Sequence, residues 1–111
     1  MVRNVPPSVD YVVETLGLEP HAEGDYYRET HRSEEKFSVD ELPKRFSGPR
    51  SVCTSIYYLL TKQSFSAIHR LKSTEVLNFY FGAAVEVLKL HPDGPGEILR
   101  LGDIREDGCV P

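Results

Sequence analysis

The chain has few of the residues that build disulfide frameworks and structural metal sites. Its 111 residues include two cysteines, Cys53 and Cys109, and no tryptophan. Because no CxxC or CxxH pairing occurs, the sequence excludes a zinc site of the usual spacing and a disulfide scaffold. Cys53 lies in an apolar run, and we predict that it is a buried and unreactive thiol.

The chain also lacks a basic surface and a long apolar segment. Its formal net charge is -4, from 13 basic and 17 acidic residues. Nucleic-acid phosphates require a basic surface, so we expect no nucleic-acid partner. No apolar run approaches the length of a membrane span, and the N-terminal residues lack the apolar core of a signal peptide. We therefore expect a cytoplasmic protein without a membrane partner.

What the chain does contain is the composition of a soluble globular protein, with 40% hydrophobic and 27% charged residues. A chain of 111 residues allows one domain at most and buries a modest core. We therefore predict a single domain over residues 1–111.

Periodicity and turn signals predict one short helix followed by about six strands. Ser8 is a suitable N-cap, an apolar face runs from Val9 to Leu16, and Gly17 is a stop signal. The predicted segments that follow are a strand at 25–33, a surface loop at 34–49, a central buried strand at 51–61, a hairpin at 65–82, strands at 85–90 and 97–101 around a turn at 91–96, and a loop at 102–108. This close spacing is typical of an all-β sandwich or barrel.

The hairpin from Phe65 to Gly82 holds the first candidate site. Its turn at 71–74 places His69 and Glu75 on neighbouring strands. Such a pair relays a proton, recognises a polar ligand or binds a divalent metal, with His69 as the base and Glu75 orienting it in the catalytic case. The alternative is an ordinary hydrogen-bonded pair at the end of a sheet.

Further metal ligands are scarce around this pair. Strand alternation places Asn78 on the face opposite Glu75, and His21 lies in the loop that precedes the first strand. A metal site needs at least three protein ligands, so a divalent metal is not favoured and the cofactor stays unknown. Both His21 and Asn78 are kept as predicted ligand-binding residues.

The segment from His21 to Ser33 is the second candidate site. Tyrosines, arginines and acids alternate along it, and regular strand spacing puts Tyr26, Arg28 and Arg32 on one face. Arginines beside a phenol suit an anionic or sugar-like ligand, while cross-strand salt bridges on an exposed strand are the alternative. The predicted ligand-binding set is His21, Tyr26, Arg28, Tyr57 and Asn78.

Three ordered motifs carry a family resemblance that runs from about Leu16 to Pro111. His21–Ser33 resembles the signature PHPEGGYYRETYRS of the small cupin 5 family, Thr54–Leu60 is similar to its central strand, and Phe65–Gly82 is similar to its segment FSxxHRLxSDExWHFYxG. The resemblance implies an RmlC-like cupin jelly roll, an incomplete double-stranded β-helix here, with a ligand pocket and usually a homodimer. Glu75 and Gly82 match the first cupin motif, but its paired histidines are not matched.

The chain departs from the family pattern at several positions. Asp25 stands where the signature has glycine, and Ala22 where it has proline. Leu77 and Asn78 replace a Trp-His pair, which removes an aromatic wall and a potential ligand. Strands that follow the second cupin motif would lie beyond Pro111, so we expect the domain to lack the family's C-terminal strands.

Cupins include oxygenases, sugar epimerases and non-enzymatic binders, and fold does not choose among them. We expect a protein that binds a small polar or anionic ligand in the barrel. One alternative is an epimerase, isomerase or lyase that uses the His69–Glu75 pair. Another is a truncated remnant that acts only through oligomerisation.

Overall fold

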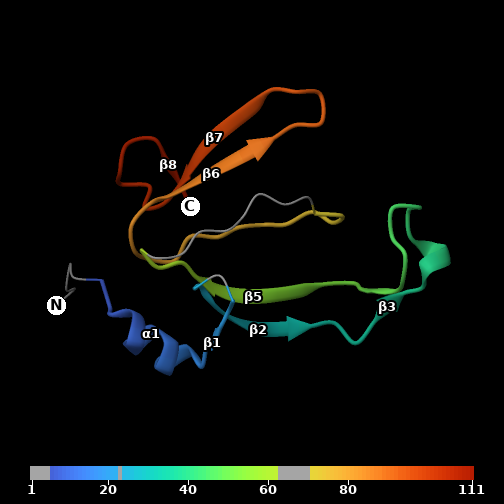
Figure 1. Cartoon of the computed structure of the whole chain (residues 1–111), viewed down its shortest axis with the longest axis horizontal. Helices are drawn as coiled ribbons and strands as arrows, with labels where there is room; N and C mark the ends of the chain where they lie inside the picture. The colour runs from blue at the N-terminus through green and yellow to red at the C-terminus, as the bar shows by residue number, and fades with distance from the viewer. Residues whose placement is uncertain (1–5, 23, 63–70) are drawn as a thin grey trace. The chain divides into compact units, whose positions relative to one another are not determined.

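The computed structural model describes residues 6–22, 24–62 and 71–111. In it the chain forms two compact units, an N-terminal unit of Pro7–Thr74 and a C-terminal unit that contains Glu75–Pro111. Most of the assigned structure is β-strand, with one short α-helix near the N-terminus (Figure 1). This composition confirms the predicted all-β class with a short N-terminal helix.

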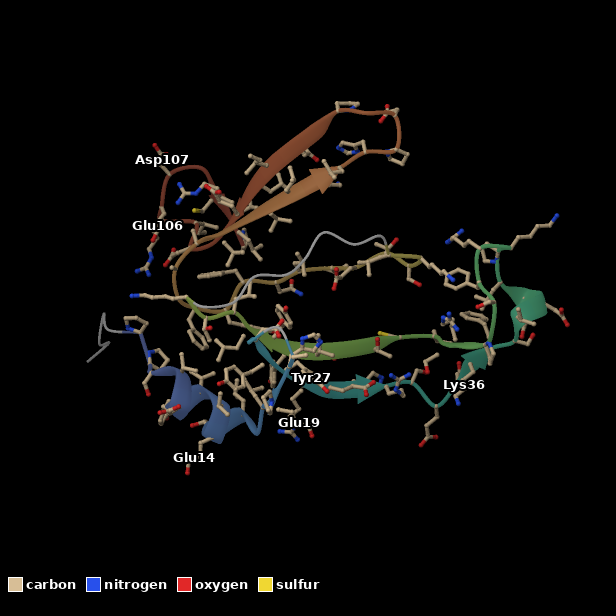
Figure 2. The ribbon with its side chains drawn as sticks, viewed as in Figure 1. Glu14, Glu19, Tyr27, Lys36, Glu106 and Asp107 are labelled. Carbon is tan, nitrogen blue, oxygen red and sulfur yellow. The ribbon has the colours of Figure 1, made fainter. Side chains whose placement is uncertain are left out.

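Helix α1 (Val9–Leu16) begins and ends where the sequence predicts. The Ser8 hydroxyl accepts a hydrogen bond from the Tyr11 amide at 3.2 Å, which satisfies one of the unpaired donors of the first turn. Gly17 ends the helix in the left-handed conformation, with a φ of 65° that favours glycine. Val12 faces the core at 5% exposure, whereas Glu14 lies on the exposed side (Figure 2).

The first sheet contains three antiparallel strands in the order β1–β2–β5. Strand β1 (Glu19–Pro20) leads through a tight loop into β2 (Tyr26–Arg32), and β5 (Thr54–Leu59) pairs along the other edge of β2. The register sets Tyr27 opposite Tyr58 and Arg28 opposite Tyr57. Strand β2 therefore lies in the middle of this sheet, side by side with β5 (Figure 1).

A β-bulge interrupts β2 and changes which side chains share a face. Glu29 pairs with Ile56 and His31 with Ser55, so one residue of β2 has no counterpart on β5. An extra residue shifts the alternation of all later side chains by one position. The predicted common face of Arg28 and Arg32 is therefore wrong, because regular alternation was assumed through the bulge.

The predicted surface loop at 34–49 contains regular structure. Strand β3 (Lys36–Phe37) pairs with β4 (Arg50–Ser51), and the 3-10 helix η1 (Val39–Glu41) follows β3. These elements are only two or three residues long and mostly polar, so the sequence shows no hydrophobic periodicity that would predict them. Phe46 is buried here at 8% exposure, so this segment contributes to the core.

Two arginines cover the buried Phe46 ring. The Cζ atoms of Arg45 and Arg50 lie 4.8 and 5.5 Å from the ring centroid. Arg45 donates from Nε to the Lys72 carbonyl oxygen at 2.7 Å, and Arg50 donates from Nη1 to the Pro49 carbonyl oxygen at 2.9 Å. Each guanidinium is therefore fixed by both a cation–π contact and a backbone acceptor.

The predicted strand at 51–61 is present as β5 but is neither central nor deeply buried. Among the described residues β5 pairs with β2 alone, and Ile56 and Tyr58 are 50% and 45% exposed. Cys53 lies directly before the strand and is exposed, so its predicted burial is wrong. The apolar run indicated a strand correctly, but composition does not reveal which neighbours cover it.

The C-terminal unit is built on a hairpin that confirms the predicted strands and turn. Strands β6 (Val85–Leu90) and β7 (Gly96–Leu101) pair antiparallel along their full length, and β8 (Cys109–Val110) adds in parallel to β7. Alternation puts Leu88, Leu90 and Ile98 on one face, where all three are more than half exposed.

The predicted hairpin at 65–82 has a different outcome. Residues 65–70, including His69, lie outside the described residues. Lys72 and Ser73 form a bend at the predicted turn, but residues 71–82 are assigned to no strand. The strand alternation that placed Asn78 on the face opposite Glu75 therefore does not apply.

No helix within the described ranges is long and apolar enough to cross a membrane. The helix α1 has 8 residues.

Gly102 occupies a position in the C-terminal unit where an added side chain would be crowded. An added Cβ would lie 3.1 Å from both the Ala84 Cβ and the Cys109 Sγ. We expect Gly102→Ala to lower the free energy of unfolding by about 1–2 kcal/mol. The cost of overpacking should outweigh the stabilisation that alanine provides by reducing the conformational entropy of the unfolded chain. Gly48→Ala is the control, since its nearest neighbour is a flexible arginine end at 3.6 Å. Equal effects in urea unfolding would contradict the prediction.

Phe46 should matter far more to stability than a neighbouring exposed phenylalanine. Phe46→Ala removes a buried ring and the support of two arginines, so we expect a loss of about 3–5 kcal/mol in unfolding free energy. Phe37→Ala, at 41% exposure, should cost about 1 kcal/mol or less. A similar loss for both variants in urea unfolding would show that the Phe46 cluster is not a core.

Candidate functional site

One face of the β2–β5 pair gathers polar side chains that are hydrogen-bond donors. We call it the Arg28 face and define it by its members on the two strands, which are Tyr26, Arg28, Thr30, His31, Ser55 and Tyr57. The register pairs Arg28 with Tyr57 directly, and the bulge brings His31 opposite Ser55. The Thr30 Oγ1 lies 2.6 Å from the Ser55 Oγ, which confirms that the extra residue projects to this face.

Arg28 is the cation of this face, and it also contacts the helix. Its Nη1 donates to the Leu16 carbonyl oxygen at 2.9 Å, at the C-terminal end of α1. A positive charge is favourable there, because the last carbonyl groups of a helix carry partial negative charge. The contact holds the guanidinium in place through one of its five N–H groups. The remaining groups can donate to a ligand.

The opposite face of the same strands carries a compensated charge pair. The Arg32 Nε lies 2.7 Å from the Glu29 Oε1. Residues three apart on a regular strand point in opposite directions, so this contact depends on the bulge between them. Acid and base are thus paired on one face, and the Arg28 face carries no carboxylate of β2 or β5.

The loop between β1 and β2 holds a second polar cluster. The His21 amide donates to the Asp25 carbonyl oxygen at 2.8 Å, which closes the loop, and the His21 Nδ1 lies 3.0 Å from the Asp25 Oδ1. Asp25 is only 1% exposed, and its Oδ2 accepts a hydrogen bond from the Tyr58 hydroxyl. The His21 ring also meets Tyr27 edge to face, with centroids 5.9 Å apart. Figure 2 shows Tyr27 beside Glu19, its partner on β1.

The structure brings together some of the predicted site residues. Tyr26, Arg28 and Tyr57 share the Arg28 face, whereas His21 contacts Asp25 and Tyr27 instead. Glu75 and Asn78 belong to the C-terminal unit, and His69 lies outside the described residues. The His69–Glu75 pair therefore stays a prediction.

Sequence reasoning missed Asp25 and Tyr58 as members of a site. A usable signal existed at Asp25, a carboxylate in a short loop at a position where the resembling signature has glycine. Nothing comparable marked Tyr58, because only the register across β2 and β5 brings its hydroxyl to Asp25.

Metal ligation finds no support in the described part of the chain. No group of three or more histidine, cysteine, aspartate or glutamate side chains comes together there as a candidate metal site.

Two carboxyl groups at turns have lowered pKa values. Backbone and side-chain hydrogen bonds from Ser38 lower the pKa of Glu41, whose Oε1 lies 3.1 Å from the Ser38 amide nitrogen. Hydrogen bonds from the side chain and amide of Arg105 lower the pKa of Asp103 to about 2. The Arg105 Nε lies 3.0 Å from each carboxylate oxygen of Asp103. Both carboxylates lie in turns outside β2 and β5, the two strands that carry the Arg28 face.

Comparison with protein families agrees with the strand-rich fold and the motifs. The family model described as Cupin superfamily (DUF985) matches residues 10–111, and the mostly β structure with one short helix is consistent with an all-β cupin jelly roll. The chain belongs to this cupin 5 family. No curated protein is significantly similar to it.

The Asp103–Arg105 contact predicts a pH dependence of stability. The pKa of Asp103 is lowered from 3.8 to about 2 in the folded chain, so its stabilising effect is complete above pH 3.8 and is lost as the pH falls through about 2. We expect the difference in unfolding free energy between wild type and Asp103→Asn to shrink in this window. A carboxyl pKa near 3.8 for Asp103 in an NMR titration would contradict this.

Proposed function

We propose that this cupin binds a small polar or anionic molecule on the Arg28 face. The proposal rests on one observation, the separation of charges by the bulge in β2. Glu29 and Arg32 pair with each other on the far side of the strands, which leaves the charge of Arg28 uncompensated by any carboxylate of the two strands. An uncompensated guanidinium is the group that proteins use to recognise carboxylate and phosphate.

The neighbours of Arg28 supply hydrogen bonds without adding negative charge. Tyr26 and Tyr57 are half-buried and each presents a phenol, while Thr30 and Ser55 present hydroxyls. Phenols and hydroxyls both donate and accept, so they suit the hydroxyl groups of a sugar-like molecule. The Arg28 face thus combines one fixed cation with several neutral polar groups.

The ligand itself is expected to be small, because the face spans a few residues on two strands. An oxyanion beside Arg28 would lie within reach of the phenol of Tyr57, its direct cross-strand partner. Binding of this kind needs no metal. We retain the homodimer as an expectation that accompanies this function.

Binding can be measured with inorganic phosphate, glucose 6-phosphate and glucose as probes in NMR titrations of the backbone amides. We expect glucose 6-phosphate to shift the amide signals of residues 26–31 and 55–57. Arg28→Gln should weaken binding of the phosphate-containing probes tenfold or more, because a lost charge-assisted hydrogen bond costs about 1.5–3 kcal/mol. Glucose alone should bind more weakly than its phosphate.

Arg32→Gln is the matched control, since it removes the same charge from the other face of the same strand. It should leave the affinity within about twofold of wild type, as expected of a surface change. Arg28→Lys retains a cation but also loses the guanidinium that contacts the helix. If Arg28→Lys binds the probes better than Arg28→Gln while the two variants have the same melting temperature, the weaker binding of Arg28→Gln comes from the lost charge and not from a loosened helix. Equal weakening in Arg28→Gln and Arg32→Gln would overturn the proposal.

A further inference from the structure

Two exposed arginines of the N-terminal unit have guanidinium edges that the described residues leave unused. Arg45 donates from Nε to the Lys72 carbonyl oxygen at 2.7 Å. Arg50 donates from Nη1 to the carbonyl oxygens of Gly48 and Pro49 at 3.3 and 2.9 Å. Within the described ranges, Arg45 therefore keeps its Nη1 and Nη2 groups for another partner, and Arg50 keeps its Nε and Nη2 groups.

Each remaining pair of N–H groups suits one anionic group. The two nitrogens of either pair lie side by side on one edge of a planar guanidinium, and such an edge matches two oxygens of a carboxylate or a phosphate. Lysine offers no edge of this kind, because its ammonium acts as a point charge. Arg45 and Arg50 thus present two bidentate edges rather than a diffuse positive charge.

The buried ring of Phe46 holds both guanidiniums in one place. The Cζ atoms of Arg45 and Arg50 lie 4.8 and 5.5 Å from the centroid of this ring, so the two cations share one aromatic neighbour. The ring is itself fixed, because Phe46 is buried. A side chain held by a ring and by a backbone acceptor loses less conformational entropy on binding than a free side chain does.

The positive charge of the two arginines is not neutralised by the described residues. Among them, neither Arg45 nor Arg50 forms an ion pair with a carboxylate. Glu41 is the nearest acid before Arg45 in the sequence, and its Oε1 instead accepts hydrogen bonds from the amide and hydroxyl of Ser38 at 3.1 and 2.9 Å. The two guanidiniums are therefore fixed cations that lack an anionic partner within the described part of the chain.

From this arrangement we infer that Arg45 and Arg50 form an anion site for a small molecule with two linked anionic groups, such as a diphosphate. Each guanidinium edge takes one group. Because both edges border the same ring, a compact molecule reaches both, and binding of its first group raises the local concentration of the second.

A small molecule fits this site better than an acidic segment of a protein. The chain has a net charge of -4, and the same surface segment carries the acids Glu34, Glu35 and Asp40. A long acidic partner would meet these like charges, whereas a compact dianion would contact the two arginines alone.

This inference is independent of the Arg28 face. Arg28 lies on β2, whereas Arg45 follows η1 and Arg50 lies on β4. The two proposed sites therefore have different backbone amides beside them, so failure of binding at one leaves the other standing.

Titration of wild type and Arg28→Gln with inorganic diphosphate, followed by NMR of the backbone amides, tests the inference. In both proteins we expect diphosphate to shift the amide signals of residues 44–48, 50 and 51. Inorganic phosphate has a single anionic group and should bind there about fivefold more weakly or worse. In the Arg28→Gln background, Arg45→Gln and Arg50→Gln should each weaken diphosphate binding about tenfold or more, because each removes one bidentate edge.

Lys36→Gln is the matched control for charge. It removes a cation from β3, and strand alternation places Lys36 on the face opposite Phe37, the cross-strand partner of Arg50. At about 0.15 M salt a diffuse surface charge is screened, so this variant should bind diphosphate within about twofold of its parent.

Melting temperatures show which variants are folded. If a glutamine variant does not fold, Arg45→Lys and Arg50→Lys decide the matter, since they keep a cation near the ring and remove the bidentate edge. Each should weaken diphosphate binding about threefold or more. Arginines that only cover Phe46 would give no diphosphate-dependent shift at residues 44–51. That result, equal affinity for phosphate and diphosphate, or equal weakening by Lys36→Gln and the arginine variants would overturn the inference.

Discussion

The pairing of β2 with β5 is the interaction on which the rest of the candidate site depends. Its register sets Arg28 opposite Tyr57 and Tyr27 opposite Tyr58, and its bulge decides the face of every later residue of β2. A slip of one residue would exchange the two faces, since side chains alternate with a period of two. The bulge therefore determines which charges of β2 meet and which stay apart.

The two faces of this sheet have different chemistry because of that register. On one face the arginine Arg28 lies among hydroxyls and phenols, and on the other Glu29 and Arg32 neutralise each other. Arg28 also donates to the last turn of α1, so the residue that we propose binds an anion is held by the main chain of the helix. A structural contact and a binding role are compatible here, because a guanidinium has several donors.

The β1–β2 loop shows how a short turn can build a site that a strand alone cannot. Burial of the Asp25 carboxylate is tolerated because the Tyr58 hydroxyl and the His21 imidazole lie against it. Two of these residues are close in sequence, and the third comes from a strand more than thirty positions away. The cluster thus joins a local turn to a long-range pairing.

Sequence reasoning succeeded where structure is local. The helix of Val9–Leu16 has its cap and its stop within its own residues, and the hairpin of β6 and β7 surrounds a turn rich in proline and glycine. It was less successful between Glu34 and Pro49, where short pairs of polar residues produce little periodicity. The second strand of the hairpin predicted at 65–82 is not present, since residues 75–82 are assigned to no strand.

The sequence by itself determined the family, the all-β class and the N-terminal helix. These features follow from local propensities and from motifs that are contiguous in the chain. Tertiary structure alone decided that Arg32 leaves the face of Arg28, that Cys53 is exposed, and that Asp25 is buried beneath His21. The face of Arg32 and the contact of Tyr58 with Asp25 depend on the register between β2 and β5, and the exposure of Cys53 depends on which segments cover it. No local pattern in the sequence encodes either of these.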